Sequence, residues 1–310
     1  MMLLLRQFIL FLTIIPLWGS GNSPHLGKAG ILVMAHGGDP EWNAAVQDAV
    51  APLRAVYPVS LALGMAQRDS LQAAVRELEY QKVKRIAVVR LFVSAESFRS
   101  QTEYLLGLSE HPPQYFIQHT QKHIDSIHNV QMLPKNLAPP PIETRATVEL
   151  NRNGLYDSEE VGQIAVERVL HLSRSPQLES ILILAHGEGD DDINRQWITK
   201  LQNLANHVAA IRPFRAVKVE TLREDWQDKR SRAEKRIRDF VTAANRRGGR
   251  VLVVPFRVYG FGPYADVLKG LDYVSDGRGL LPHATVTRWI KQQAEDCFQR
   301  MVSANSGKSN

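Results

Sequence analysis

The sequence lacks most features that mark proteins outside the ordinary globular class. It holds a single cysteine, Cys297, in 310 residues, so neither an intramolecular disulfide nor a cysteine-based metal cluster can form. Aromatic residues make up only 7% of the chain, and nothing after the first twenty-odd residues resembles a membrane span. Any metal chemistry must therefore use histidines and carboxylates.

The remaining composition is that of a folded protein with two domains. Hydrophobic residues account for 44% and charged residues for 23%, which excludes a disordered polymer and a polytopic membrane protein. Lys and Arg number 38 against 32 Asp and Glu, a formal net charge of +6. This positive charge raises the possibility of a polyanionic partner. Whether such a partner is expected depends on where along the chain the excess of Lys and Arg lies.

The N-terminal segment 1–23 resembles a secretory signal peptide. Arg6 precedes an apolar run over 8–18, and small residues follow, with Gly19 and Gly21 suited to a cleavage site. An uncleaved membrane anchor is the alternative, although a spanning helix needs about 20 apolar residues. We expect an exported protein, periplasmic or extracellular.

Two motifs occur twice in the same order. The segment Gly30–Gly37, GILVMAHG, returns as Ser180–Gly187, SILILAHG, and Arg85–Val93 is echoed by Arg250–Val258. Continuous apolar, β-branched runs of this kind are typical of strands buried on both faces of a parallel sheet. Apolar residues at helical spacing follow each histidine, which predicts a tandem pair of doubly wound α/β domains.

The domain boundary is expected in a proline-rich linker. Residues 109–145 hold six of the 16 prolines, a density typical of linkers. We predict an N-terminal domain over 29–110, a linker over 111–150 and a C-terminal domain over 151–303. The linker also carries His119 and His123 at helical i, i+4 spacing, so it is either a metal-scavenging segment or a solvated polar one.

His36 and His186 each stand at the end of the first strand of their half, where open α/β sheets bind ligands. Hydrogen bonding to a neighbouring loop is the alternative role for each. Three classes of protein place a His-Gly pair at the end of a strand: histidine phosphatases, α/β-hydrolases and metal chelatases. Histidine phosphatases need an arginine before the histidine, where this chain has Ala35 and Ala185. α/β-Hydrolases need a Gly-x-Ser-x-Gly elbow, which is absent. Metal chelatases are the remaining class.

These residues resemble the CbiX-type sirohydrochlorin cobaltochelatase family, relatives of the ferrochelatases, in its long two-domain form. The resemblance rests on Leu32–Gly37, on Val88–Ser94 and on their counterparts in the second half. It implies insertion of a divalent metal ion, Co²⁺, Fe²⁺ or Ni²⁺, into a tetrapyrrole without a nucleotide cofactor. It places His36, and by repeat symmetry His186, among the metal-binding groups.

The family's second active-site histidine is missing from both halves. The loop after the Leu-Phe strand reads Ser94–Phe98 and its counterpart Tyr259–Tyr264, neither with a histidine. Glu96 is the candidate substitute, as ligand or proton acceptor, unless it is a solvated loop carboxylate. His283 lies in a late loop and is expected to be structural rather than catalytic.

Two functions therefore stay open from the sequence. One is a chelatase that uses His36 and Glu96 catalytically; the other is an exported metal or tetrapyrrole carrier that has lost turnover. Residues 223–250 carry a surplus of +5, which an exposed, salt-bridged helix explains better than nucleic-acid binding. No nucleic acid and no stable membrane partner beyond the export signal are expected. The sequence leaves the oligomeric state open, and a monomer is compatible with it because the duplication supplies both halves.

Overall fold

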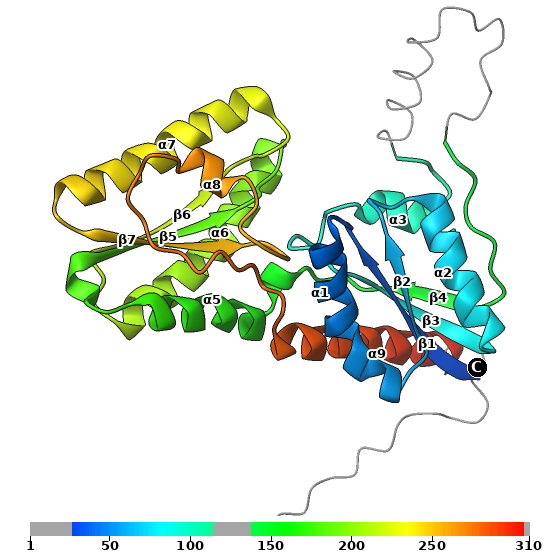
Figure 1. The fold of residues 1–310 in the computed structure, drawn as a ribbon. Helices are drawn as coiled ribbons and strands as arrows, with labels where there is room; N and C mark the ends of the chain where they lie inside the picture. The colour runs from blue at the N-terminus through cyan, green and yellow to red at the C-terminus, as the bar shows by residue number, and fades with distance from the viewer. Residues whose placement is uncertain (1–26, 114–137, 307–310) are drawn as a thin grey trace, which may run out of the picture.

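The computed structural model describes residues 27–113 and 138–306. Its strands form two parallel sheets, each covered by helices on both faces, so the expected α/β class with two doubly wound units is confirmed (Figure 1). No helix of these two stretches is both long enough and apolar enough to span a bilayer. The predicted signal segment and the linker histidines His119, His123 and His128 lie outside the described residues.

The N-terminal sheet has the strand order β2-β1-β3-β4. Its strands are β1 (Lys28–Ala35), β2 (Val59–Leu63), β3 (Val83–Arg90) and β4 (Thr147–Leu150). The helices of this part of the chain are α1 (Pro40–Val50), α2 (Arg68–Tyr80) and α3 (Arg99–Leu105), with a 3-10 turn, η1 (Ala51–Ala55), after α1. Alternate residues of β1 face opposite layers, Ile31 and Val33 toward α1, Leu32 and Met34 toward α2, as the two-residue period of a strand requires.

The C-terminal sheet repeats the central part of this arrangement, with the order β6-β5-β7. Its strands are β5 (Glu179–Ala185), β6 (Ala216–Thr221) and β7 (Arg250–Phe256). The helices are α5 (Glu159–Leu172), α6 (Asp191–Ile211), α7 (Gln227–Arg246) and α8 (Tyr264–Val267), with 3-10 turns η2 (Leu155–Asp157) and η3 (Pro176–Leu178). Residues 224–226 form a loop between β6 and α7.

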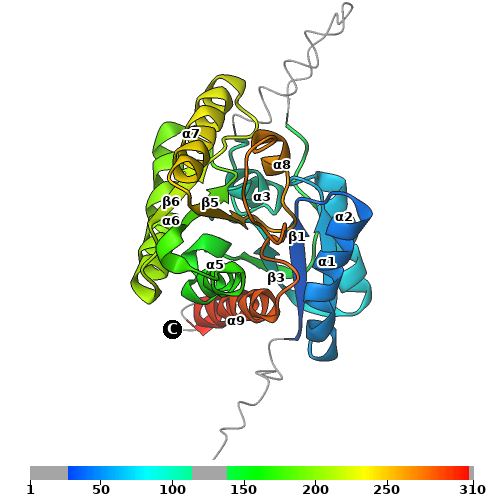
Figure 2. The ribbon, with the colours of Figure 1, turned by 60° about the vertical axis from the view of Figure 1, so that its left-hand side comes forward.

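The last helix, α9 (Ala284–Ser306), belongs to the N-terminal layer although it ends the described chain. It packs against β3, β4 and α1 and lies beside α5, as Figure 2 shows. Arg300 Nε donates to Glu149 Oε1 of β4 over 2.7 Å. The predicted boundaries therefore differ from the structure at two points. β4 lies inside the expected linker 111–150, and α9 lies inside the expected C-terminal domain 151–303. The sequence could not assign α9 to a unit, because its apolar face could cover either of the two similar sheets.

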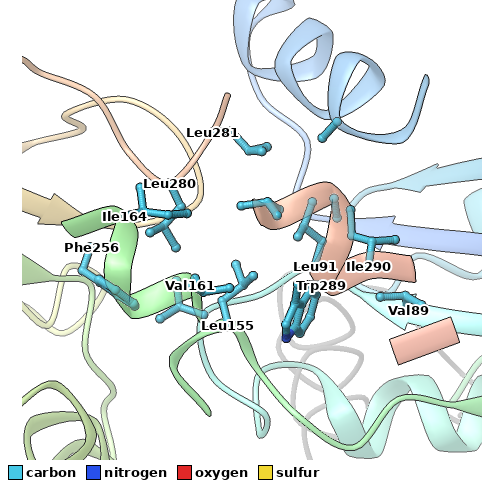
Figure 3. Packing of buried hydrophobic residues seen from close by; sticks show 14 of the residues in the cluster. Val89, Leu91, Leu155, Val161, Ile164, Phe256, Leu280, Leu281, Trp289 and Ile290 are labelled. Carbon is cyan, nitrogen blue, oxygen red and sulfur yellow. The ribbon is translucent and has the colours of Figure 1, made fainter. Parts of the chain in front are cut away.

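One continuous apolar cluster joins the two units. It runs from Val89 of β3, and Leu91 just after that strand, through Trp289 and Ile290 of α9 to Val161 and Ile164 of α5, and on to Phe256 of β7 (Figure 3). All seven side chains are buried. Because interiors pack at crystal-like density, this shared core fixes how the carboxyl ends of the two sheets face each other.

Candidate functional site

The two predicted histidines end the central strands of their sheets. His36 follows Ala35, the last residue of β1, and His186 follows Ala185, the last residue of β5. Each is followed by a glycine in the left-handed region, with φ of 79° at Gly37 and 81° at Gly187. A Cβ at Gly187 would lie 2.6 Å from the Cβ of Thr221. Glycine therefore lets the chain turn sharply here and leaves the histidine at the sheet edge.

Both imidazoles bond to their own loop through the same nitrogen. Nδ1 of His36 lies 2.6 Å from the carbonyl oxygen of Gly37, and Nδ1 of His186 lies 2.8 Å from that of Gly187. A carbonyl only accepts, so Nδ1 is the donor and the neutral ring keeps its lone pair on Nε2. Both histidines thus present Nε2, a common metal-ligating atom, away from their own strands.

The loop after β6 brings two carboxylates to His186. Oδ2 of Asp225 lies 3.3 Å from His186 Nε2, and Oε2 of Glu224 lies 3.9 Å from it. Arg223, with φ of 58°, donates its backbone N–H to the carbonyl of His186 over 2.6 Å. Oε1 of Glu224 is 3.3 Å from Nη1 of Arg257, which follows β7. Three strand ends of the C-terminal sheet therefore meet at one imidazole.

The charges of this cluster shift the pKa values of two of its members. Burial opposes charge on His186, but the hydrogen bond to Asp225 and the charge of Glu224 outweigh it and raise the pKa of His186. The hydrogen bond from His186 lowers the pKa of Asp225 against a smaller opposing effect of burial, with further contributions from the charges of His186 and His36. His36 thus acts on the same carboxylate from the other unit.

The equivalent loop of the N-terminal unit carries no carboxylate. Strand register pairs Ala35 with Leu63 and Ala185 with Thr221, so Met65, Ala66 and Gln67 correspond to Arg223, Glu224 and Asp225. The two halves therefore differ chemically: one offers an exposed histidine, and the other a half-buried histidine with two acids.

Indole rings surround both histidines. The ring of Trp42 lies 6.3 Å from that of His36, and the rings of Trp197 and Trp226 lie 6.5 and 6.2 Å from that of His186. Trp226 meets His186 edge-on, at 87°. A Cβ at Gly189 would lie 2.2 Å from the Trp226 ring, so the indole rests directly on the glycine backbone. Flat apolar surface therefore borders the polar cluster.

The loop that was expected to supply a substitute ligand is held by a buried arginine. Arg90 donates to the carbonyl oxygens of Ala95 over 2.8 Å and Ser97 over 3.0 Å, and burial lowers its pKa to about 10. The side chain of Glu96 is exposed and forms an ion pair with Arg99 at 3.5 Å. The structure therefore gives Glu96 a partner other than His36, and its catalytic role stays a prediction.

His283 lies at the start of α9, apart from the strand-end cluster. Its Nε2 is 3.1 Å from Oε2 of Glu167 on α5, and its Nδ1 accepts from the backbone N–H of Thr285 over 3.2 Å. These contacts fit the structural role expected for it.

The cluster is an incomplete metal site. Across residues 27–113 and 138–306, no three His, Cys, Asp or Glu side chains lie close enough to hold a metal ion. Two surface hollows lie elsewhere: one of about 420 Å³ between α5 and α6, which includes Gln163 and His207, and one of about 460 Å³ beside Arg76 and Arg145. The arrangement at His186 can therefore hold a metal ion only weakly, with further ligands from solvent or substrate.

Sequence reasoning missed Glu224, Asp225 and Arg257. The two acids entered only the charge balance of the basic segment, and Arg257 only the strand echo. A signal was present, because Glu224 and Asp225 follow the alternating stretch AVKVET of β6 within a few residues and therefore belong to the edge where ligands bind.

Comparison with known proteins finds a family match in the first part of the chain. Residues 30–102, from β1 into α3, match the CbiX family model. This stretch includes His36 but not His186 or Asp225, and its similarity to the CbiX family confirms the resemblance seen in the sequence. A search of curated protein sequences gives no match to the chain.

Solved structures extend the likeness to both units. SirB from Bacillus subtilis with Fe³⁺ is 14% identical with a TM-score of 0.55, over 86% of this chain and 96% of SirB. The sirohydrochlorin chelatase SirB from Bacillus subtilis subspecies spizizenii in complex with cobalt is 12% identical with a TM-score of 0.52, over 87% and 95% of the two chains. A multi-domain protein from Deinococcus radiodurans, described as similar to chelatases, gives 16% identity and a TM-score of 0.47, over 86% and 54%. At these identities the first two matches establish the fold.

Proposed function

We propose that the chain is a chelatase that inserts a divalent metal ion into a sirohydrochlorin-type tetrapyrrole held between its two units. The observation that carries this proposal is the contact of His186 Nε2 with Asp225 at 3.3 Å, with His36 acting on the same carboxylate from the opposite unit. His186 and Asp225 hold the metal ion, and His36 faces it from the other side.

The reaction exchanges one M²⁺ ion for the two protons on the pyrrole nitrogens of the macrocycle. These protons need acceptors, and the free Nε2 of His36 can take one, because Nδ1 of the same ring donates to the carbonyl of Gly37. The pair of His186 and Asp225 becomes available as its metal ion leaves, and Nε2 of His186, whose pKa this carboxylate raises, can take the other. The pair thereby replaces the family's second histidine, a role for which Glu96 was the candidate from the sequence.

A weak site suits a metal ion that is a substrate. An imidazole with one or two carboxylates binds first-row divalent ions such as Co²⁺, Fe²⁺ and Ni²⁺ without demanding one of them. Three or more fixed ligands would retain the ion, and no such set exists among residues 27–113 and 138–306. Fe³⁺ and cobalt are the metals in the two SirB structures, which supports an ion of this kind here.

Trp226 and Trp42 support a flat, aromatic substrate. Aromatic rings favour offset or edge-on contacts with other π systems, and each indole stands beside one strand-end histidine. A macrocycle placed between the units would meet an indole on either side of its metal-binding centre.

An exported carrier is the second candidate. The loops after β3 and β7 lack a histidine, and residues 1–23 have the pattern of a signal peptide. A protein that binds a metal ion or tetrapyrrole outside the cytoplasm, without turnover, would need the same cluster. We propose export for either function.

A metal-insertion assay distinguishes the two candidates. The full chain is mixed with sirohydrochlorin and Co²⁺, and the absorption change of the macrocycle is followed for the native protein, His36→Ala, His186→Ala and the control His171→Ala, which alters an exposed histidine of α5. We expect the control to match the native rate and both site variants to fall toward the uncatalysed rate. Equal rates for all four proteins would exclude catalysis at this site.

Metal binding to the same proteins then tests the carrier function. Equilibrium dialysis with Co²⁺ should show binding that His186→Ala abolishes. A protein that binds Co²⁺ through His186 but does not accelerate insertion is a carrier.

A further inference from the structure

The edge of the C-terminal sheet opposite the site carries a cluster of arginines. Helices α5, α6 and α7 end there and strands β5, β6 and β7 begin there, on the side of this unit farthest from the N-terminal sheet, at the left of Figure 1. Six arginines belong to these helix ends and strand starts: Arg174, Arg212, Arg215, Arg246, Arg247 and Arg250. We call this set the arginine edge.

Contacts within the structure hold the arginine edge together. The buried carboxylate of Glu179 accepts from Nη1 of Arg250 over 2.8 Å and from the backbone N–H of Arg174 over 3.0 Å. The backbone N–H of Arg215 donates to the carbonyl of Glu179, and its Nη1 donates to the carbonyl of Arg247 over 3.0 Å. Residues far apart in the sequence are thus brought onto one surface.

Among residues 27–113 and 138–306, five of these guanidinium groups have no carboxylate partner. Within the described chain, Arg250 is the member of the arginine edge that forms a salt bridge, with Glu179. One further acid, the exposed Asp272, lies close by, since its carbonyl accepts from Asn245 over 2.9 Å. Six arginines against these two carboxylates leave a net charge of +4 at this edge.

The body of α7 contrasts with its end. Arg230 pairs with Glu234, Arg232 with Asp228, and Lys235 with Asp239, at 2.8, 3.1 and 2.6 Å. The salt-bridged helix face expected from the sequence is therefore present over the body of α7, whereas Arg246 and Arg247 at its end join the arginine edge.

Two large apolar side chains are exposed on the same edge. Leu178 in η3, directly before Glu179, is 52% exposed, and Ile211 at the end of α6, directly before Arg212, is 42% exposed. Apolar side chains set among arginines are the composition of surfaces that rest in a bilayer interface, where the apolar groups enter the acyl boundary and the bases meet phosphates.

We propose that the arginine edge binds the surface of an anionic lipid bilayer. Guanidinium groups hydrogen-bond phosphate oxygens in pairs, and Leu178 and Ile211 enter the interface between headgroups. Membrane contact here leaves the opposite edge, with His36 and His186, pointing away from the bilayer. This partner was not expected from the sequence, and it does not depend on the proposed chelatase activity.

A bilayer accounts for this surface better than a nucleic acid does. Phosphate contacts explain the arginines in either case, but exposed aliphatic side chains gain nothing from a sugar-phosphate backbone. Single-stranded nucleic acids are bound by aromatic side chains on which bases stack, and Leu178 and Ile211 cannot supply that contact.

Vesicle sedimentation with the full chain tests the proposal. Binding is measured to phosphatidylcholine vesicles and to vesicles that also contain phosphatidylglycerol, and the difference between them is the readout. The apolar N-terminal segment is the same in all variants, so any vesicle binding that it causes is common to them. The phosphatidylcholine vesicles measure that contribution. The variants are Arg215→Gln/Arg246→Gln/Arg247→Gln and Leu178→Asn/Ile211→Asn. The matched control is Arg230→Gln/Arg232→Gln/Lys235→Gln, which removes the same charge from the salt-bridged face.

We expect the native chain and the control to prefer anionic vesicles. Each arginine near an anionic surface changes partitioning about fivefold, so the arginine variant should lose on the order of a hundredfold. The Leu178/Ile211 variant should lose binding without losing salt sensitivity. Equal binding by native chain and arginine variant, each with an unchanged melting temperature, would overturn the proposal. Arginine-dependent binding to duplex DNA or RNA without vesicle binding would overturn it as well.

Discussion

Nε2 of His186 lies 3.3 Å from Oδ2 of Asp225, and each group shifts the pKa of the other in the direction that favours their ion pair. When His186 is protonated, its Nε2–H lies between imidazole and carboxylate, in the position that a metal ion would take. Proton and metal compete for these two atoms, which gives Asp225 a direct part in the proposed reaction.

Replacing Asp225 by asparagine should reduce metal insertion about 10–100-fold, the usual cost of losing a carboxylate that supports a metal-binding histidine. The variant keeps the size of the side chain but removes its charge. Asp228→Asn is the control, because that residue pairs with Arg232 on the exposed face of α7. An unchanged rate in Asp225→Asn would remove this carboxylate from the mechanism.

Trp226→Ala should weaken binding of the metal-free macrocycle. Stacking of an aromatic ring on a flat heterocycle contributes about 1–3 kcal/mol, so an affinity loss of roughly fivefold to a hundredfold is expected. Trp226→Phe should retain most of the affinity, since it keeps a ring beside His186. Titration of the macrocycle's absorption band measures both variants, and equal affinities for alanine and phenylalanine would show that the ring makes no contact.

Trp289→Ala should destabilise the N-terminal sheet although the residue lies near the end of the described chain. The indole is 5% exposed within the core shared by both units, and truncation of a buried tryptophan costs about 3–5 kcal/mol. Hydrogen exchange should accelerate in β3 as well as in α9. The neighbouring Arg288→Ala is the control, since its 3.9 Å ion pair with Glu160 is exposed and worth little. Faster exchange confined to α9 would contradict the shared core.

Glu179 should make the stability of the C-terminal unit depend on acid pH. Burial alone would raise its pKa, but hydrogen bonds from the backbone of Arg174, the hydroxyl of Ser173 and the backbone of Ser175, with the charge of Arg250, lower it overall. A lowered folded-state pKa gives stability that is present above the unfolded value of 4.5 and is lost as pH falls through the folded value.

Denaturant titrations between pH 7 and pH 3 measure this contribution. The native chain should lose unfolding free energy below about pH 4.5, and Glu179→Gln should lose less over the same interval while being less stable at pH 7. Glu110→Gln, at an exposed position, should follow the native curve. Parallel curves for native chain and Glu179→Gln would refute the assignment.

The sequence predicted the sheets and the histidines because their signals are local. An apolar run such as Ile31–Ala35 can be buried on both faces only in a sheet centre, and a His-Gly step at its end marks the ligand-binding edge. The central strands and the positions of His36 and His186 follow from such patterns.

The acidic loop and the last helix could not be read in the same way. Asp225 becomes a candidate site residue only through its contact with His186, which lies 39 positions earlier in the sequence. Its own segment, 223–250, has the charge pattern of an ordinary solvated helix. The apolar stripe of α9 fits either sheet, and shared core contacts with Val89 and Leu91 decide between them. Both features depend on long-range packing.

Because α9 packs against the N-terminal sheet, it also determines which of the two units can finish folding first. β1 and β3 are synthesised before α9, so the face that they bury against Trp289 and Ile290 stays uncovered until residues 284–306 have been made. The C-terminal unit, whose strands lie between β4 and α9 in the sequence, can form its own sheet before that. The N-terminal sheet is therefore completed after the C-terminal sheet, and its apolar face needs protection until then.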